Sequence, residues 1–170
     1  DVTLIPGDGS PVGVAQVLAS TPGVEGWFSE VERRSTFQEG AFLSVAIGGD
    51  PAAADYRVVE GRSIRAAGEA IAGYGFLDRF GVAVGDEIEL LAGTTPVDVT
   101  IVGWYRDTED SGEILRYRIE TLIAAEPGVV PTVYRIVAAD GTGATELAAS
   151  LTEQLGPTAR TEILDTGVDD

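Results

Sequence analysis

Acidic side chains are the residues of this sequence best suited to do chemistry. The chain has 28 Asp and Glu residues but no His and no Cys, so the commonest general base and the thiolate nucleophile are both missing. Ser hydroxyls lack a His or Lys to activate them, because every basic residue is Arg. Paired carboxylates hydrolyse glycosidic bonds, but among so many acids some pairs lie close by chance. We therefore expect no catalytic residue, and a carboxylate hydrolase ranks third among the hypotheses below.

One dense group of acids offers oxygen ligands of the kind that Ca²⁺ prefers: Asp107, Glu109, Asp110 and Glu113. Their spacing lacks the central glycine and the final Glu of an EF-hand loop. A run of like charges is more often a solvated, mobile surface loop. We therefore expect no bound metal here.

The first residues carry two glycines between an expected strand and an expected helix, an arrangement that can cradle a phosphate. The third glycine of that pattern should stand at Val12, and Gly13 comes one residue late. A chain without Lys also lacks the P-loop lysine. The stretch Val2–Gly9 resembles the start of isopropylmalate- and isocitrate-type dehydrogenases, but the likeness ends soon after it. We expect no cofactor.

The charge and composition exclude other classes of function. The net charge is −17, which disfavours both nucleic acid and anionic lipid headgroups as partners. The chain is 44% hydrophobic, enough to bury a core without disulfides. It has no apolar run long enough to span a bilayer, no signal peptide and no Met, and we expect it to be a piece excised from a longer protein.

Adjacent aromatic residues are the best sign of a binding surface. Trp27 precedes Phe28, and Trp104 precedes Tyr105; in a strand, the two members of such a pair face opposite sides. One of each pair is then core, and the other is a partner contact or a harmless surface residue. The predicted partner site combines an aromatic anchor with acids that steer a basic partner, and its residues are Trp104, Tyr105, Asp107, Glu109, Asp110 and Glu113.

Two parts of the chain repeat one plan. A strand at Val2–Ile5 precedes a helix capped by Ser10, with Pro11 at its first position, and an extended segment runs from Val24 to Phe37. Near the other end, a strand at Thr132–Ala138 precedes a helix that Thr142 should cap and Gly156 should end, followed by a strand at Arg160–Leu164. Both parts read as strand–helix–strand and should meet in one layered subdomain.

The middle of the chain is richer in strands. Alternating apolar residues predict strands around Ile88 and Ile101, joined as a hairpin, and Phe76–Phe80 should form a short helix closed by Gly81. The expected fold class is α+β, with residues 41–126 inserted as a β-rich subdomain between residues 1–40 and 127–170.

Five short motifs occur in order between Val59 and Arg106: Glu60-Gly61-Arg62, Gly68-Glu69-Ala70-Ile71, Leu77-Asp78-Arg79-Phe80-Gly81, Val84-Gly85-Asp86-Glu87-Ile88 and Val99-Thr100-Ile101-Val102-Gly103. In this order they resemble the MacB-like periplasmic core domain of FtsX-type ABC permeases. Pro22-Gly23-Val24 and the helix within residues 140–156 resemble that family too. Two segments depart from its pattern, Gly73-Tyr74-Gly75 and Asp107–Tyr117.

The resemblance implies a porter-like α+β subdomain, formed by the two strand–helix–strand units, with the β-rich subdomain inserted. It also implies a place outside the cytoplasmic membrane, between the first two membrane helices of a permease driven by a cytoplasmic ATPase. The implied partners are those helices, the ATPase, and an envelope lipoprotein or exported substrate to which the domain couples ATP-driven movement. The alternative is a free-standing secreted binding or adhesion module.

This layout has consequences for the whole domain. Asp1 and Asp170 should lie on the same side of the porter-like subdomain, and the insert should carry the partner surface. Alanine substitutions in the predicted partner site should impair transport and leave stability nearly unchanged. The isolated domain should be a monomer or weak dimer.

Overall fold

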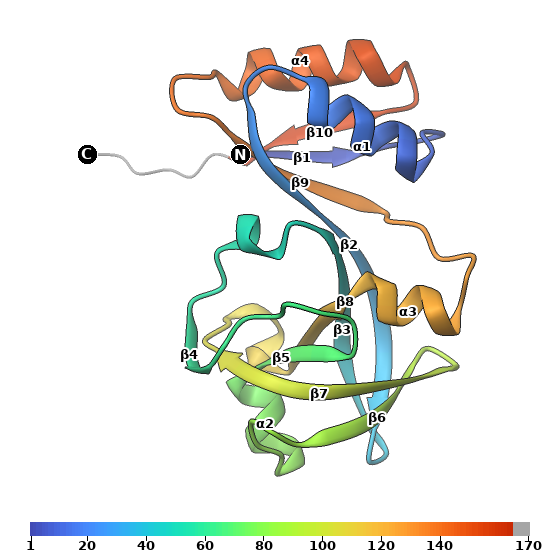
Figure 1. Cartoon of the computed structure of the whole chain (residues 1–170), viewed down its shortest axis with the longest axis vertical. Coiled ribbons are helices and arrows are strands. Elements are labelled where there is room, and N and C mark those ends of the chain that lie inside the picture. Colours follow the sequence, from blue (N-terminus) through green and yellow to red (C-terminus); the bar gives the residue numbers. More distant parts are fainter. Residues whose placement is uncertain (165–170) are drawn as a thin grey trace. The chain divides into compact units, whose positions relative to one another are not determined.

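The computed structural model describes residues 1–164, with the side chains of residues 109 and 110 excepted. The chain forms two compact units: unit 1 comprises Asp1–Glu30 and the chain from Val130 onward, and unit 2 comprises Val31–Val129. The sequence-based boundaries, after residues 40 and 126, differ from these, and the separation into domains stays a prediction. Each unit is described below by itself (Figure 1).

Unit 1 contains both strand–helix–strand segments. Its elements are β1 (Val2–Ile5), α1 (Pro11–Ser20), the first half of β2 (Val24–Phe37), β9 (Val133–Ala138), α4 (Ala144–Leu155) and β10 (Arg160–Ile163). The strands lie in the order β10-β1-β9-β2, and each neighbouring pair is antiparallel. Each strand–helix–strand segment thus has a strand of the other segment between its own two strands, a split βαβ arrangement. The α+β prediction, with both segments in one layered unit, is confirmed.

Both helices of unit 1 cover the same face of the sheet (Figure 1). Val14 and Leu18 of α1 and Leu147 and Leu151 of α4 pack with Leu4 of β1 in one buried cluster. Burying these apolar faces together keeps the helices on the sheet.

The helix ends of unit 1 follow the sequence signals with one exception. Ser10 accepts a hydrogen bond from the Gly13 backbone N–H at 3.1 Å, as an N-cap should, and Gly156 ends α4. The predicted N-cap of α4 is wrong: Gly143 holds that position without a side-chain hydrogen bond. Thr142 instead closes the preceding turn through its backbone N–H, which donates to the Ala139 carbonyl at 3.0 Å.

The first and last described residues meet in unit 1. The backbone N–H of Leu164 donates to the carbonyl of Asp1 at 3.1 Å, and Val2 pairs with Ile163. The described chain therefore begins and ends at neighbouring points of one sheet edge. Asp170 lies outside the described residues.

Unit 2 is a closed sheet with short helices. Its elements are the second half of β2, β3 (Gly40–Gly49), η1 (Pro51–Ala54), β4 (Val58–Gly61), β5 (Glu69–Gly73), α2 (Tyr74–Phe80), β6 (Glu87–Ala92), β7 (Thr95–Tyr105), η2 (Glu109–Gly112), β8 (Ile114–Arg118) and α3 (Ile119–Ala125). Strands β2, β3, β8, β5 and β7 lie side by side in that order. Strand β6 pairs with both β7 and β2, so the sheet closes into a small barrel.

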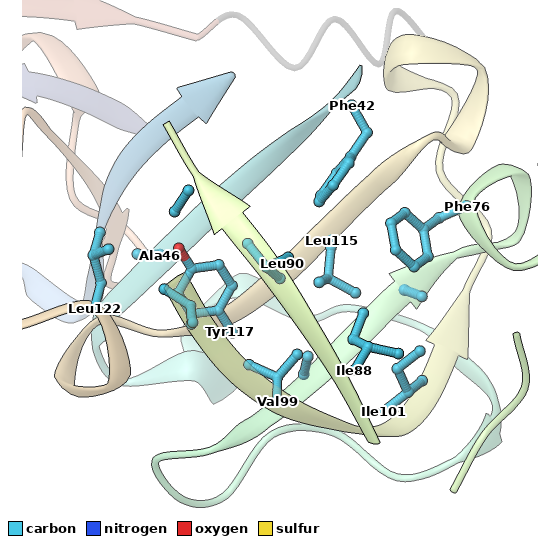
Figure 2. Close-up of a cluster of buried hydrophobic side chains, with 14 of the residues drawn as sticks. Phe42, Ala46, Phe76, Ile88, Leu90, Val99, Ile101, Leu115, Tyr117 and Leu122 are labelled. Carbon is cyan, nitrogen blue, oxygen red and sulfur yellow. The ribbon is translucent and has the colours of Figure 1, made fainter. Parts of the chain in front are cut away.

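The barrel encloses one hydrophobic core. Figure 2 shows Phe42 of β3, Ile88 and Leu90 of β6, Ile101 of β7 and Leu115 of β8 pointing toward one another. Phe76 of α2 closes the cluster, with its ring 4.9 Å from that of Phe42 between centroids. The alternation predicted for β6 and β7 is confirmed, since Ile88, Leu90, Val97, Val99 and Ile101 are all buried.

The hairpin between β2 and β3 contains a strained turn. Its two connecting residues, Gln38 and Glu39, both have positive φ, 47° and 64°. Two-residue hairpin turns of this kind favour Asn-Gly, because other residues pay for the left-handed conformation.

We expect Glu39→Gly to raise the free energy of unfolding by about 0.5–1 kcal/mol, because glycine adopts positive φ without steric cost. The matched control is Glu32→Gly at an exposed position of β2. This substitution should lower the free energy of unfolding by about 0.5–1 kcal/mol. Urea unfolding of both variants measures the difference; equal destabilisation would contradict this account of the turn.

Candidate functional site

The predicted partner site lies where β7 ends and the acidic segment begins. Tyr105 is buried, with 3% of its surface exposed, whereas Trp104 is half-buried. We expected one member of this pair to belong to the core, and that member is Tyr105. Tyr105 is therefore not a surface contact. Glu109 and Asp110 begin η2, and their side chains lie outside the described part of the structure.

A buried guanidinium organises the residues around Tyr105. Arg116 of β8 is 7% exposed, and its Nε donates to the Tyr105 hydroxyl at 2.6 Å. That hydroxyl lies 2.8 Å from Asp107 Oδ2, which also receives Arg116 Nη2 at 3.4 Å. The ring of Tyr56 lies 5.0 Å from the Arg116 guanidinium, close enough for a cation–π contact. Burial raises the pKa of the Tyr105 phenol, so this hydroxyl keeps its proton and serves as a hydrogen-bond donor.

The acidic segment is thus attached to unit 2 rather than solvated along its length. Asp107 is 14% exposed at its side chain and pairs with Arg116, while Glu113 pairs with Arg79. The η2 backbone also packs against Gly73 and Gly75, since a Cβ on either would lie 2.3 Å from an η2 carbonyl oxygen. The expected solvated loop is corrected here: its first and last acids have structural partners on different strands or helices.

A second set of side chains lies outside the predicted site but next to Trp104. Tyr74, the first residue of α2, is 56% exposed, and its ring centroid is 5.3 Å from that of Trp104. Trp104 Nε1 donates to Glu60 Oε2 of β4 at 3.1 Å. Neither Tyr74 nor Glu60 was predicted from the sequence as a site residue. An exposed aromatic between Gly73 and Gly75, where this chain departs from the family pattern, was the available signal.

Two residues of the family-like motifs form a charge pair with many hydrogen bonds. Arg62 Nη1 donates to Glu69 Oε2 at 2.8 Å, and the backbone N–H groups of Arg65 and Ala66 donate to the same oxygen. The Arg62 hydrogen bonds, helped by these backbone donors, lower the pKa of Glu69 to about 2. The carboxylate thereby holds the loop between β4 and β5 in place.

Two depressions lie on the described surface of unit 2. A depression of about 410 Å³ is lined by the acids Glu87, Glu89 and Asp98. A second, of about 340 Å³, is lined by Arg34, Arg79 and neighbouring residues. Among residues whose side chains are described, no group of three acids is placed to hold a metal ion.

Known structures share this fold. The periplasmic region of MacB from Actinobacillus actinomycetemcomitans is 12% identical with a TM-score of 0.70, covering 95% of this chain and 87% of that one. The extracellular domain of the noncanonic ABC-type transporter YknZ from Gram-positive bacteria is 11% identical with a TM-score of 0.72, covering 96% and 100%. A domain described as that of a permease protein from Porphyromonas gingivalis is 13% identical with a TM-score of 0.55, covering 94% and 85%.

The similarity to known proteins is evident in the fold and not in the sequence as a whole. No protein-family model matches the chain, and no curated protein matches its sequence. The resemblance to the MacB-like periplasmic core domain, seen in short ordered motifs, is confirmed as a likeness of fold over nearly the whole chain. Within residues 1–164, no helix is both long and apolar enough to cross a membrane.

We expect Asp107→Ala to lower the free energy of unfolding by about 2–4 kcal/mol, because it removes a carboxylate from a buried guanidinium. Glu113→Ala is the matched control in the same segment: its pair with Arg79 is more than a third exposed on both sides, so the loss should stay below about 1 kcal/mol. Urea unfolding compares the two. Equal, small losses would show that the segment is a solvated loop after all.

The Glu69 pair predicts a pH dependence of stability. The pKa of Glu69 is lower in the folded chain than in the unfolded one, so its contribution is complete above pH 4.5 and is lost as the pH falls toward about 2. Glu69→Gln should therefore lower the free energy of unfolding by about 2 kcal/mol at pH 7. The difference in stability between this variant and the parent protein should shrink as the pH falls from 4.5 toward about 2.

The control for this experiment is Glu120→Gln, which removes a carboxylate that pairs with Arg118 and is 52% exposed. It should change stability by less than about 1 kcal/mol at either pH. A Glu69→Gln difference that stays constant from pH 7 to about pH 2 would refute the account of the Glu69 carboxylate.

Proposed function

We propose that this chain is the extracytoplasmic domain of an ABC transporter permease. The observation that carries the proposal is the fold, shared over 95% and 96% of this chain with extracytoplasmic domains of MacB and YknZ. These neighbours are described as periplasmic and extracellular, which supports the same side of the membrane for this chain. At 11–13% identity, the transported substrate does not carry over.

The positions of the first and last described residues support insertion between two membrane helices. A domain placed in a loop between consecutive helices must start and finish near one place. Here Asp1 and Leu164 are hydrogen-bonded neighbours at the edge of the unit 1 sheet. The β1–β10 pairing that joins them would transmit a movement of either flanking segment to the sheet as a whole.

In this proposal the domain performs no chemistry of its own. ATP hydrolysis by a cytoplasmic subunit would move the membrane helices, and the helices would move unit 1 through β1 and β10. Unit 2 would meet an envelope partner or exported substrate. The rival function is a free-standing secreted binding module, which the contact of exposed Tyr74 with half-buried Trp104 would also suit.

A labelling experiment on the full-length gene product separates the two. The chain contains no Cys, so Glu153→Cys on the exposed side of α4 supplies a unique thiol within it. We expect a membrane-impermeant maleimide to label this residue in intact cells, with the labelled protein retained in the membrane fraction. A matched Cys in the ATPase subunit should react only after lysis.

Each contrary outcome has a clear meaning. Labelling of the chain only after lysis would place it on the cytoplasmic side and overturn the proposal. Recovery of the labelled protein in the medium, free of membrane, would favour the secreted module. Loss of coupling is tested separately: if a hydrolysis-deficient ATPase subunit leaves transport intact, the domain does not relay ATP-driven movement.

A further inference from the structure

An aromatic and acidic patch lies in unit 2 where β4, β7 and the first residue of α2 come together. Glu60 of β4 pairs with Trp104 of β7, and Trp104 pairs with Ala72 of β5, two residues before Tyr74. The patch comprises Glu60, Tyr74 and Trp104, joined by the Tyr74–Trp104 ring contact and the Trp104–Glu60 hydrogen bond. Tyr74 is 56% exposed and Trp104 is half-buried, so water covers aromatic surface that most proteins would bury.

The backbone holds the aromatic pair in place. A Cβ on Gly73 or Gly75 would lie 2.3 Å from a carbonyl oxygen of η2, so the two residues that flank Tyr74 are packed directly on another backbone segment. Trp104 is fixed by pairing on both sides of β7 and by its hydrogen bond to Glu60. Binding at a surface already ordered costs less side-chain entropy than binding at a mobile one.

The charge of the patch specifies what would bind it. The Glu60 carboxylate accepts the Trp104 Nε1 hydrogen bond, and no basic side chain among the described residues forms an ion pair with it. Ring faces attract cations through their quadrupole, and Trp does so most strongly. A carboxylate beside two aromatic rings therefore favours a guanidinium or ammonium group that carries aliphatic carbons.

We propose that this patch docks an arginine- or lysine-bearing segment of a partner protein. The cationic head lies over the ring of Trp104 or Tyr74 and pairs with Glu60, while its aliphatic stem covers the exposed ring edges. This site shares Trp104 with the site predicted from the sequence, but it does not rest on Asp107 or Glu113, which already have arginine partners within the chain. An anionic membrane surface is disfavoured by the charge of −17.

The inference rests on the proposed function, in which unit 2 meets an envelope partner, but it is tested on the chain alone. The chain has two Trp residues, so in a Trp27→Phe background Trp104 is the only indole. The probe is acetylated hexa-arginine amide, titrated in buffer with physiological salt. We expect a saturable change in Trp104 emission.

Matched variants separate local docking from general attraction. Tyr74→Ala should weaken binding about tenfold, whereas Ile123→Ala, which removes another exposed apolar side chain, should leave it unchanged. Glu60→Gln should weaken binding at least about threefold. Glu153→Gln removes the same charge from an exposed position in unit 1 and should have a much smaller effect. Circular dichroism of each variant checks that it is folded.

Several results would overturn the inference. Equal weakening by Glu60→Gln and Glu153→Gln would mean that net charge alone attracts the peptide. Saturation without a change in Trp104 emission would place the binding surface elsewhere. Binding of phosphatidylglycerol vesicles but not of the peptide would assign the patch to a membrane. If Tyr74→Ala fails to fold, the Glu60 and Glu153 variants decide the question. None of these results bears on the labelling experiment, so the two proposals can fail separately.

Discussion

A buried positive charge is the constraint on which this end of unit 2 depends. The guanidinium of Arg116 lies almost entirely out of water, and such a group is tolerated only where acceptors and aromatic faces surround it. Asp107 and the Tyr105 hydroxyl come from the chain that leaves β7, and the Tyr56 ring comes from the segment before β4. The Arg116 guanidinium thus fixes two connecting segments on the barrel. Because Asp107 lies just before η2 in the chain, holding Asp107 in place also sets the position of η2. The patch at Tyr74 depends on this in turn, because η2 packs on the glycines beside it.

The motifs that gave the family resemblance have structural explanations. Gly61 has a positive φ of 79°, and a Cβ there would lie 2.2 Å from the Val102 carbonyl oxygen. A Cβ on Gly103 would lie 2.3 Å from the carbonyl oxygen of Arg62. These glycines let β4 approach β7 closely, and the Arg62–Glu69 pair then fastens the loop that follows. Such residues identify an architecture and not a ligand, so they remain recognisable where overall identity to the known structures is only 11–13%.

The sequence predicted local features better than long-range pairing. The Ser10 cap, the Gly81 and Gly156 helix ends and the alternation in β6 and β7 depend on neighbouring residues, and the structure contains all of them. The closure of the barrel through Ser35 and Thr36 of β2 with β6 depends on residues far apart in the sequence, and no local pattern encodes it. The Thr142 cap failed because Gly143 and the preceding turn satisfy the backbone instead. For the site, the sequence indicated the adjacent residues Trp104 and Tyr105, but it did not show which of the two rings is buried. Nor did it show which of the nearby acids have partners within the chain.

The net charge of −17 does not by itself make a specific surface. At physiological ionic strength, exposed charges are screened beyond a Debye length of about 8 Å, so distant acids raise the rate of encounter with a basic partner more than the affinity. Three acids of unit 2 already have partners: Glu69, Asp107 and Glu113 each pair with an arginine of the same chain. Glu60 differs because its described partner is the Trp104 indole, a donor that leaves most of the carboxylate's charge uncompensated. In the proposed docking, specificity comes from the place where an uncompensated carboxylate meets aromatic rings, and the total acidity of the chain would serve to bring a basic partner there.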